Sequence, residues 1–268
     1  ACHKKGSASL APNQPSLGGI NSVNAAETAY PRLLVLFSHP LAAEHGQPMG
    51  ILDLEAERKA IFRAFESHKV PVSVCFDIAT TENLSRHLLA GCDWLHRSGH
   101  GSPSSLAFEN RSGGVHAVQG DALRRLLSAA GNPPRLCFVS ACHSRSVGEA
   151  LVEAGVQHVV AVDLDQRILD RAAIVFARDF YQALAVGRTV RQAFDMGKAA
   201  VAADPDLGVK AEQESSKFRL LPDSGNHDVS LCQAVQSGQP VDTSEALPET
   251  NLPTRRPDFT GRAQDLHW

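Results

Sequence analysis

Leu33-Leu34-Val35-Leu36-Phe37 is an unbroken apolar run that His39-Pro40 closes. A run this short and this uniformly apolar is typical of a parallel strand buried on both faces. Downstream, residues 53–69 carry apolar side chains at helical spacing, and residues 70–78 are rich in valine. A buried strand, a helix and a second strand in this order predict a βαβ unit.

The alternation of strands and helices continues along the chain. We expect strands over 93–98, 136–140 and 156–162, a β-hairpin over 105–118, and helices over 80–91, 121–130, 147–154, 168–184 and 189–203. Strands that alternate with helices imply a mainly parallel sheet with helices on both faces. The predicted fold class is therefore α/β, in the form of a three-layer α/β/α sandwich.

The composition changes at both ends of this pattern. Residues 1–30 contain scattered Ser, Gly, Asn and Pro without periodicity, which predicts a disordered N-terminal segment. Residues 31–235 fit one α/β domain. Residues 236–258 hold Pro240, Pro248, Pro253 and Pro257 among polar residues, a composition typical of a linker.

The overall composition excludes several classes of protein. The chain has 268 residues, of which 43% are hydrophobic, so it can bury a sizeable core. Its net charge of −3 argues against a nucleic-acid partner, and its apolar runs are far too short to cross a membrane. Its six cysteines are sparse and form no CxxC pair, which favours a reduced, cytoplasmic compartment.

Reactive side chains follow two of the predicted strands. His100 lies between Gly99 and Gly101 after the strand at 93–98, and Cys142 lies between the strand at 136–140 and the next helix. Backbone N–H groups and the positive end of a helix favour a thiolate at such a position. If the two strands are neighbours, both side chains face one cleft, in the Cys–His arrangement used for covalent acyl transfer.

Longer segments around these residues resemble the CHAT domain, a caspase-like, separase-related family of cysteine peptidases. The segments are 96–101, 140–144, 168–181 and 187–194. The resemblance implies a caspase-like sandwich and a cysteine endopeptidase, with Cys142 as nucleophile and His100 as the acid/base that protonates the leaving amine. It also implies an oxyanion hole formed by the backbone N–H groups of Gly101 and Cys142.

The substrate-binding residues are expected beside the nucleophile. Related metacaspases carry an acidic residue two positions before the cysteine, where it helps to bind a basic P1 side chain, and this chain has Ser140 there. Asp163, just after the strand at 156–162, is a second candidate for the negative charge. The ordinary alternative for Asp163 is a solvated or capping residue.

Two other motifs compete for the same residues. Gly99-His100-Gly101-Ser102-Pro103-Ser104 nearly matches a dinucleotide-binding fingerprint, but Ser104 replaces the third glycine and no helix follows. A zinc site built from His96, His100, Cys142 and His143 lacks any dedicated ligand spacing. We therefore expect neither a cofactor nor a metal. The competing function is a catalytically inert caspase-like docking module.

The last residues predict a larger context. Phe259-Thr260-Gly261-Arg262 resembles the start of the ATPase module in STAND-type signalling proteins, although the chain contains no GxxxxGK[ST] P-loop. We therefore expect residues 259–268 to begin a downstream ATPase module. The expected partners are a protein substrate and the ATPase and sensor regions of the same, longer chain.

Overall fold

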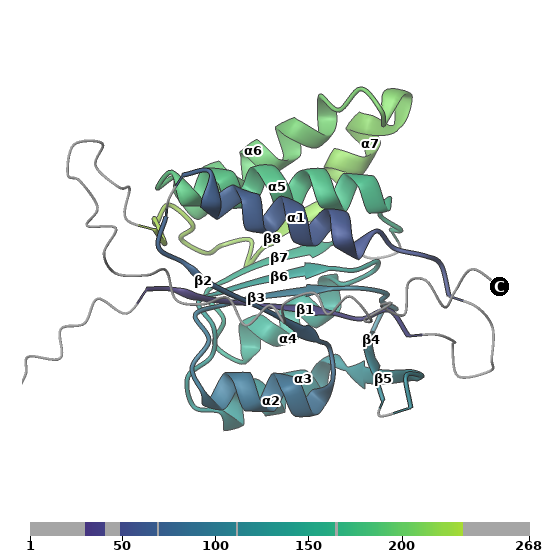
Figure 1. The fold of residues 1–268 in the computed structure, drawn as a ribbon, viewed down its shortest axis with the longest axis vertical. Coiled ribbons are helices and arrows are strands. Elements are labelled where there is room, and N and C mark those ends of the chain that lie inside the picture. Colours follow the sequence, from purple (N-terminus) through teal and green to yellow (C-terminus); the bar gives the residue numbers. More distant parts are fainter. Residues whose placement is uncertain (1–29, 41–48, 69, 111, 164–165, 233–268) are drawn as a thin grey trace, which may run out of the picture.

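A six-stranded sheet runs through the centre of the molecule (Figure 1). The computed structural model describes residues 30–40, 49–68, 70–110, 112–163 and 166–232. The sheet has the order β2-β1-β3-β6-β7-β8, with β1 (Arg32–Phe37), β2 (Ser73–Ile78), β3 (Trp94–Ser98), β6 (Leu136–Ser140), β7 (His158–Val162) and β8 (Phe218–Leu221). The neighbouring strands are parallel, except that β8 is antiparallel to β7.

Helices cover both faces of the sheet (Figure 1). One layer contains α1 (Leu54–Glu66), α5 (Asp170–Ala185), α6 (Val190–Ala202), the short 3₁₀ turn Gly208–Lys210 and α7 (Ala211–Ser216). The other contains α2 (Thr81–Leu89), α3 (Gly120–Ala129) and α4 (Arg145–Glu153), with the hairpin β4 (Ser105–Glu109) and β5 (Val115–Gln119) beside it. The predicted three-layer α/β/α sandwich with a mainly parallel sheet is confirmed.

Two of the helices, α2 and α6, begin at threonines whose side chains cap them. The Thr80 side chain accepts a hydrogen bond from the backbone N–H of Asn83 at the start of α2. Thr189 and Gln192 form a reciprocal capping box at the start of α6. Each cap satisfies a backbone N–H group that has no partner within its own helix.

The central strands are buried on both faces, as the apolar runs predict. Every residue of β3, β6 and β7 is buried. On one side, Phe138 of β6 packs edge-on against Phe176 and Phe180 of α5. Because β3 is fully enclosed, its polar residues His96, Arg97 and Ser98 must find hydrogen-bond partners inside the protein.

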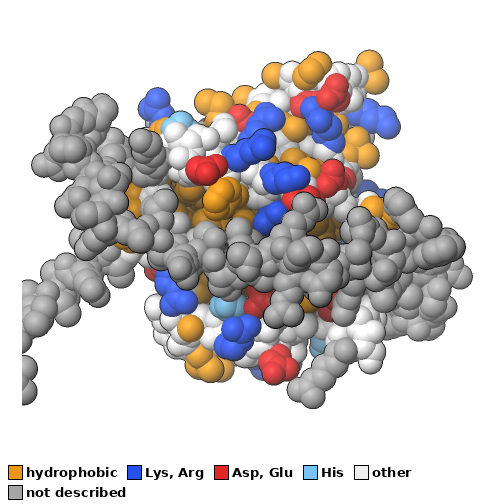
Figure 2. Space-filling model, in the orientation of Figure 1, with side chains coloured by type: hydrophobic (Ala, Val, Ile, Leu, Met, Phe, Trp, Pro, Cys, Tyr) orange, Lys and Arg blue, Asp and Glu red, His pale blue; other side chains and the backbone are white. Residues whose placement is uncertain are grey.

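The helical layer that contains α1, α5 and α6 carries charged side chains on its solvent side. In the view of Figure 2, basic and acidic side chains are interspersed over this layer. Within α1, Glu55 pairs with both Arg58 and Lys59, and within α5, Arg178 pairs with Asp179. Within the described ranges, no helix has the length and apolar character needed to cross a membrane.

Three elements of the described chain were not predicted from the sequence. They are the 3₁₀ turn, α7 and β8, and all three lie between the last predicted helix and the predicted end of the domain at residue 235. β8 has only four residues, too few to display an alternating pattern, and its place is fixed by pairing with β7. The predicted segments 236–258 and 259–268, and residues 1–29 of the predicted disordered segment, lie outside the described residues.

A buried histidine pair predicts acid sensitivity of the fold. His158 and His227 are buried, with their Nδ1 atoms 2.8 Å apart. Burial, together with the charge of His227, lowers the pKa of His158 to about 4. The unfolded chain, with a histidine pKa of about 6.5, therefore binds more protons between these two values. We expect the free energy of unfolding to fall by about 2 kcal/mol between pH 7.5 and pH 5 because of His158.

Urea unfolding at the two pH values measures this effect. His158→Gln removes the titrating ring, so its free energy of unfolding should depend less on pH than that of the wild type. An equal fall in both proteins would contradict the assignment to His158.

Candidate active site

The two strands that lead to His100 and Cys142 are neighbours. β3 and β6 pair in parallel, and Ser98 lies opposite Ser140 in their register. Because the strands are parallel, both end at the same edge of the sheet, so the turns that follow them lie side by side. β3 and β6 are therefore neighbours, as the predicted Cys–His arrangement requires.

The two turns are in direct contact through glycine backbone. The N–H of Gly99 donates to the carbonyl oxygen of Ser140 at 3.2 Å. At Gly101, an added Cβ would lie 2.5 Å from the carbonyl oxygen of Cys142 and 3.0 Å from the Cβ of Ala141. Only a residue without a side chain fits this position. The glycine after His100 therefore allows the two turns to approach each other.

His100 is held in a defined orientation. Its Nε2 lies 2.9 Å from the carbonyl oxygen of Gly50, to which it donates a hydrogen bond. Its own carbonyl oxygen accepts hydrogen bonds from the N–H of Ala107 and from the guanidinium of Arg97. A neutral ring that donates through Nε2 has Nδ1 free as a proton acceptor. Nδ1 is therefore the nitrogen available for chemistry.

Cys142 lies in a sharp turn between β6 and α4. His143 has a φ of 57°, in the left-handed region that side chains other than glycine seldom adopt. The N–H of His143 donates to the carbonyl oxygen of Gln166 at 3.1 Å, which fixes this conformation. Such strained residues cluster at functional sites.

Ser144 does not cap α4 with its side chain, although it lies at the start of that helix. Its hydroxyl is buried, donates to the carbonyl oxygen of Val139 and accepts from the N–H of Val162 at 2.9 Å. It therefore joins β6 to β7 directly beneath the Cys142 turn.

Two backbone N–H groups in the contacting turns have no hydrogen-bond acceptor among the described residues. Within the described part of the chain, the N–H groups of Gly101 and Cys142 donate to no acceptor. They belong to adjacent turns that touch at the Cys142 carbonyl. Unpaired donors next to a nucleophile can stabilise a developing oxyanion. This is the pair that the family resemblance implies.

The other thiols of the described residues differ from Cys142 in their surroundings. Cys92, Cys137 and Cys232 are buried, whereas Cys75 and Cys142 are partly exposed. Burial raises the pKa of Cys92 and of Cys232 to about 12, and it raises that of Cys137 well above its ordinary value. These three buried thiols are therefore protonated and unreactive at neutral pH.

A buried carboxylate that the sequence did not reveal lies under both strand ends. Glu57 of α1 is 2% exposed and accepts hydrogen bonds from the hydroxyls of Ser98 and Ser140. Ser140, a predicted substrate-binding residue, is thus buried and engaged with Glu57. His96 is fully buried and binds Glu57 through Nε2 and Tyr181 through Nδ1.

The second predicted substrate-binding residue, Asp163, lies just beyond β7. Its carboxylate forms ion pairs with Arg145 of α4, at 3.2 Å, and with Arg219 of β8, at 2.6 Å. Asp170, the first residue of α5, accepts a hydrogen bond from the N–H of Asp53 at 2.9 Å. The structure therefore brings the turn that contains His100 and Gly101 into backbone contact with the Cys142 turn, and it places Asp163 in an ion-pair cluster with two arginines.

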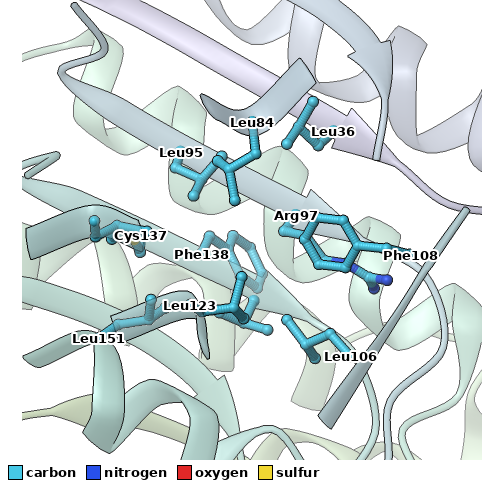
Figure 3. A pocket seen from close by; sticks show the side chains of 12 residues that line it. Leu36, Leu84, Leu95, Arg97, Leu106, Phe108, Leu123, Cys137, Phe138 and Leu151 are labelled. Carbon is cyan, nitrogen blue, oxygen red and sulfur yellow. The ribbon is translucent and has the colours of Figure 1, made fainter. Parts of the chain in front are cut away.

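An internal cavity of about 20 Å³ lies on the side of the sheet that α2, α3 and α4 cover (Figure 3). Its lining is apolar apart from Arg97, whose guanidinium lies over the ring of Phe108. A space of this size holds about one water molecule. Among the described residues, no group of three or more His, Cys, Asp or Glu side chains is placed to hold a metal ion.

Comparisons with known proteins identify the family and the fold of this chain. The family model of the CHAT domain matches residues 10–217. Gingipain R, an Arg-specific cysteine proteinase of known structure, is 16% identical with a TM-score of 0.52, over 75% of this chain and 46% of that chain. A structure described as a protease is 13% identical with a TM-score of 0.53, over 76% of this chain and 49% of that one. No curated protein sequence matches.

These likenesses concern the fold, because the identities are low. The chain spans about half the length of each of these two solved structures. The family match begins inside the predicted disordered segment and ends shortly before β8, so it contains both strand ends and both turns of the site. The match extends over most of the sequence, and the fold is the caspase-like fold of cysteine peptidases. The chain belongs to the CHAT domain family.

Proposed function

We propose that this chain is a cysteine endopeptidase that cleaves a protein substrate through a Cys142–His100 dyad. The observation that carries the proposal is the contact between the two turns, in which the N–H groups of Gly101 and Cys142 have no acceptor among the described residues. The caspase-like fold supports it.

The proposed reaction uses these groups in sequence. The Cys142 sulfur attacks the substrate carbonyl carbon as its proton passes to His100 Nδ1, and the oxyanion receives hydrogen bonds from the N–H groups of Gly101 and Cys142. When the carbon–nitrogen bond breaks, His100 returns the proton to the leaving amine. Water then attacks the thioester, gives a proton to His100, and releases the acid and the free thiol. The Gly50 carbonyl accepts the Nε2 proton throughout, so that Nδ1 is the nitrogen that gains and loses a proton.

A labelling experiment tests the proposed function. A peptidyl electrophile should modify Cys142 ahead of Cys75, the other partly exposed thiol among the described residues, and prior modification should block cleavage of a peptide library. Mass spectrometry of tryptic peptides identifies the modified residue. Equal labelling of Cys142 and Cys75, with no cleavage in the library, would contradict the proposal and favour a docking module.

The pH dependence of cleavage gives a second check on His100. Burial is the main cause that lowers the pKa of His100, and the charges of His39 and Arg97 act in the same direction. The neutral ring is the form that accepts the thiol proton, so we expect the acid limb of kcat/KM to lie below pH 6.5.

Asp170 provides the matched variant for this pH profile. Its carboxylate favours the protonated form of His100 and so opposes the lowering of the pKa. Asp170→Asn should therefore move the acid limb to still lower pH. A shift to higher pH would contradict the assignment of the limb to His100.

The substrate preference and the regulation are proposed from the sequence. Asp163 can bind a basic P1 side chain only by giving up contacts with Arg145 or Arg219. A P1 library measured with Asp163→Ala tests its role, and an unchanged preference would exclude it. We also propose that downstream ATPase and sensor regions gate the peptidase, although residues 259–268 lie outside the described residues. Equal proteolysis by the longer protein with and without nucleotide would contradict gating.

A further inference from the structure

A single buried carboxylate connects the two strand ends that carry His100 and Cys142. Glu57 Oε2 accepts a hydrogen bond from Ser98 Oγ at 2.5 Å, and Glu57 Oε1 accepts one from Ser140 Oγ at 3.1 Å. Ser98 and Ser140 lie opposite each other in the β3–β6 register. Each lies two residues before a proposed catalytic residue. The Glu57 side chain of α1 therefore links the ends of β3 and β6 at paired positions, immediately before the two turns of the site.

The Glu57 carboxylate also binds His96, which in turn binds Tyr181. His96 Nε2 lies 3.2 Å from Glu57 Oε1, and His96 Nδ1 lies 3.1 Å from the Tyr181 hydroxyl of α5. Burial alone would raise the pKa of Glu57, but the hydrogen bonds from His96, Ser98 and Ser140 outweigh it and lower the pKa. An ionised carboxylate is acceptor-only and can take all three hydrogen bonds at once.

Resting on the proposed function, we propose that Glu57 is a positioning residue whose carboxylate fixes the separation between the His100 turn and the Cys142 turn. Gly99 and Gly101 give the His100 turn little stiffness of its own, so the position of the strand end matters for it. Glu57 is 2% exposed, which leaves it out of reach of a substrate. Its removal should therefore lower kcat and leave KM nearly unchanged.

Two variants of Glu57 distinguish a role in positioning from a role of its charge, because one keeps the length of the side chain and the other keeps the charge. Glu57→Gln keeps the length and one acceptor oxygen, and the serine hydroxyls can turn to accept from its amide. Glu57→Asp keeps the charge but is one methylene too short to bridge Ser98 and Ser140. We expect Glu57→Asp to lose about 100-fold in kcat, since displacements near 1 Å have effects of this size, and Glu57→Gln to retain most of the rate.

The experiment uses the full chain and two readouts. The first is kcat and KM on a cleaved peptide. The second is the rate of Cys142 alkylation by iodoacetamide as a function of pH, with and without His100→Ala, which measures how far His100 activates the thiol. Asp204→Asn is the matched control, because Asp204 is also buried and paired, with Arg171, away from β3 and β6. It should leave both readouts unchanged.

The outcomes separate this proposal from the proposed function. Loss of the His100-dependent alkylation in Glu57→Asp, with retention in Asp204→Asn, supports positioning. Wild-type kcat and alkylation in folded Glu57→Asp would overturn positioning alone. If His100→Ala leaves wild-type alkylation unchanged, the dyad itself is refuted. If Glu57→Asp does not fold, the double variant Ser98→Ala/Ser140→Ala should show the same fall in kcat, and an unchanged kcat would overturn the proposal.

Discussion

Replacement of Cys142 by alanine is expected to lower peptide-bond hydrolysis by about 10⁴-fold or more while the fold stays intact. The thiol is the only group proposed to form the covalent intermediate, and the two N–H groups of the oxyanion hole supply only part of the rate without it. Cys142 is partly exposed, and its sulfur forms no hydrogen bond within the described residues, so its loss should change the free energy of unfolding by less than about 0.5 kcal/mol.

The measurement is single-turnover cleavage of a peptide, with near-ultraviolet circular dichroism to confirm the fold. Cys75→Ala is the matched control, because within the part of the chain that the structure describes Cys75 is the other partly exposed thiol, and it should keep the wild-type rate. His100→Ala should lose a similar factor to Cys142→Ala, and the double variant should be no slower than either, since the two residues act as a unit. Cleavage by Cys142→Ala at more than a few per cent of the wild-type rate would refute the nucleophile.

The fold was largely predictable because burial leaves a direct signature in these strands. Leu33 to Phe37 of β1 is apolar because helices cover both faces of the sheet, and the same holds for Leu136 to Val139 of β6. β8 gave no such signal, because its four residues owe their conformation to hydrogen bonds with β7. Pairing with a strand that is distant in the sequence depends on tertiary structure, so a short stretch of sequence does not predict it.

The candidate site was predictable only in part. His100 and Cys142 follow strand ends, and the rule that parallel strands expose their carboxyl ends at one edge places them together. Glu57 was hidden, because a glutamate in the first turn of a helix is ordinarily explained by the helix dipole. Its partners Ser98 and Ser140 lie 41 and 83 residues away along the chain. Only the packing of α1 against the sheet shows that they meet.

Replacement of Gly101 by alanine is the second change expected to have a large effect. The new Cβ would lie 2.5 Å from the carbonyl oxygen of Cys142, and real Cβ atoms do not approach an oxygen so closely, so the two turns must separate. A separation of about 1 Å between reacting groups lowers the rate of a positioned reaction by about 100-fold. We therefore expect kcat/KM to fall by about this factor, with a loss of about 1–3 kcal/mol in the free energy of unfolding.

Gly120→Ala is the control that separates crowding at the site from a general effect of replacing glycine. At Gly120, an added Cβ would lie 3.4 Å from the Cβ of Ala150, which is an ordinary contact, and the position starts α3, where alanine is the better helix former. Gly120→Ala should keep the wild-type kcat/KM and at least the wild-type stability. The rate of Cys142 alkylation distinguishes the two variants further, because separation of the turns should remove its dependence on His100 in Gly101→Ala alone. If Gly101→Ala instead cleaves peptides at the wild-type rate, contact between the two turns is not what assembles the active site, and the Cys142–His100 mechanism loses its geometric basis.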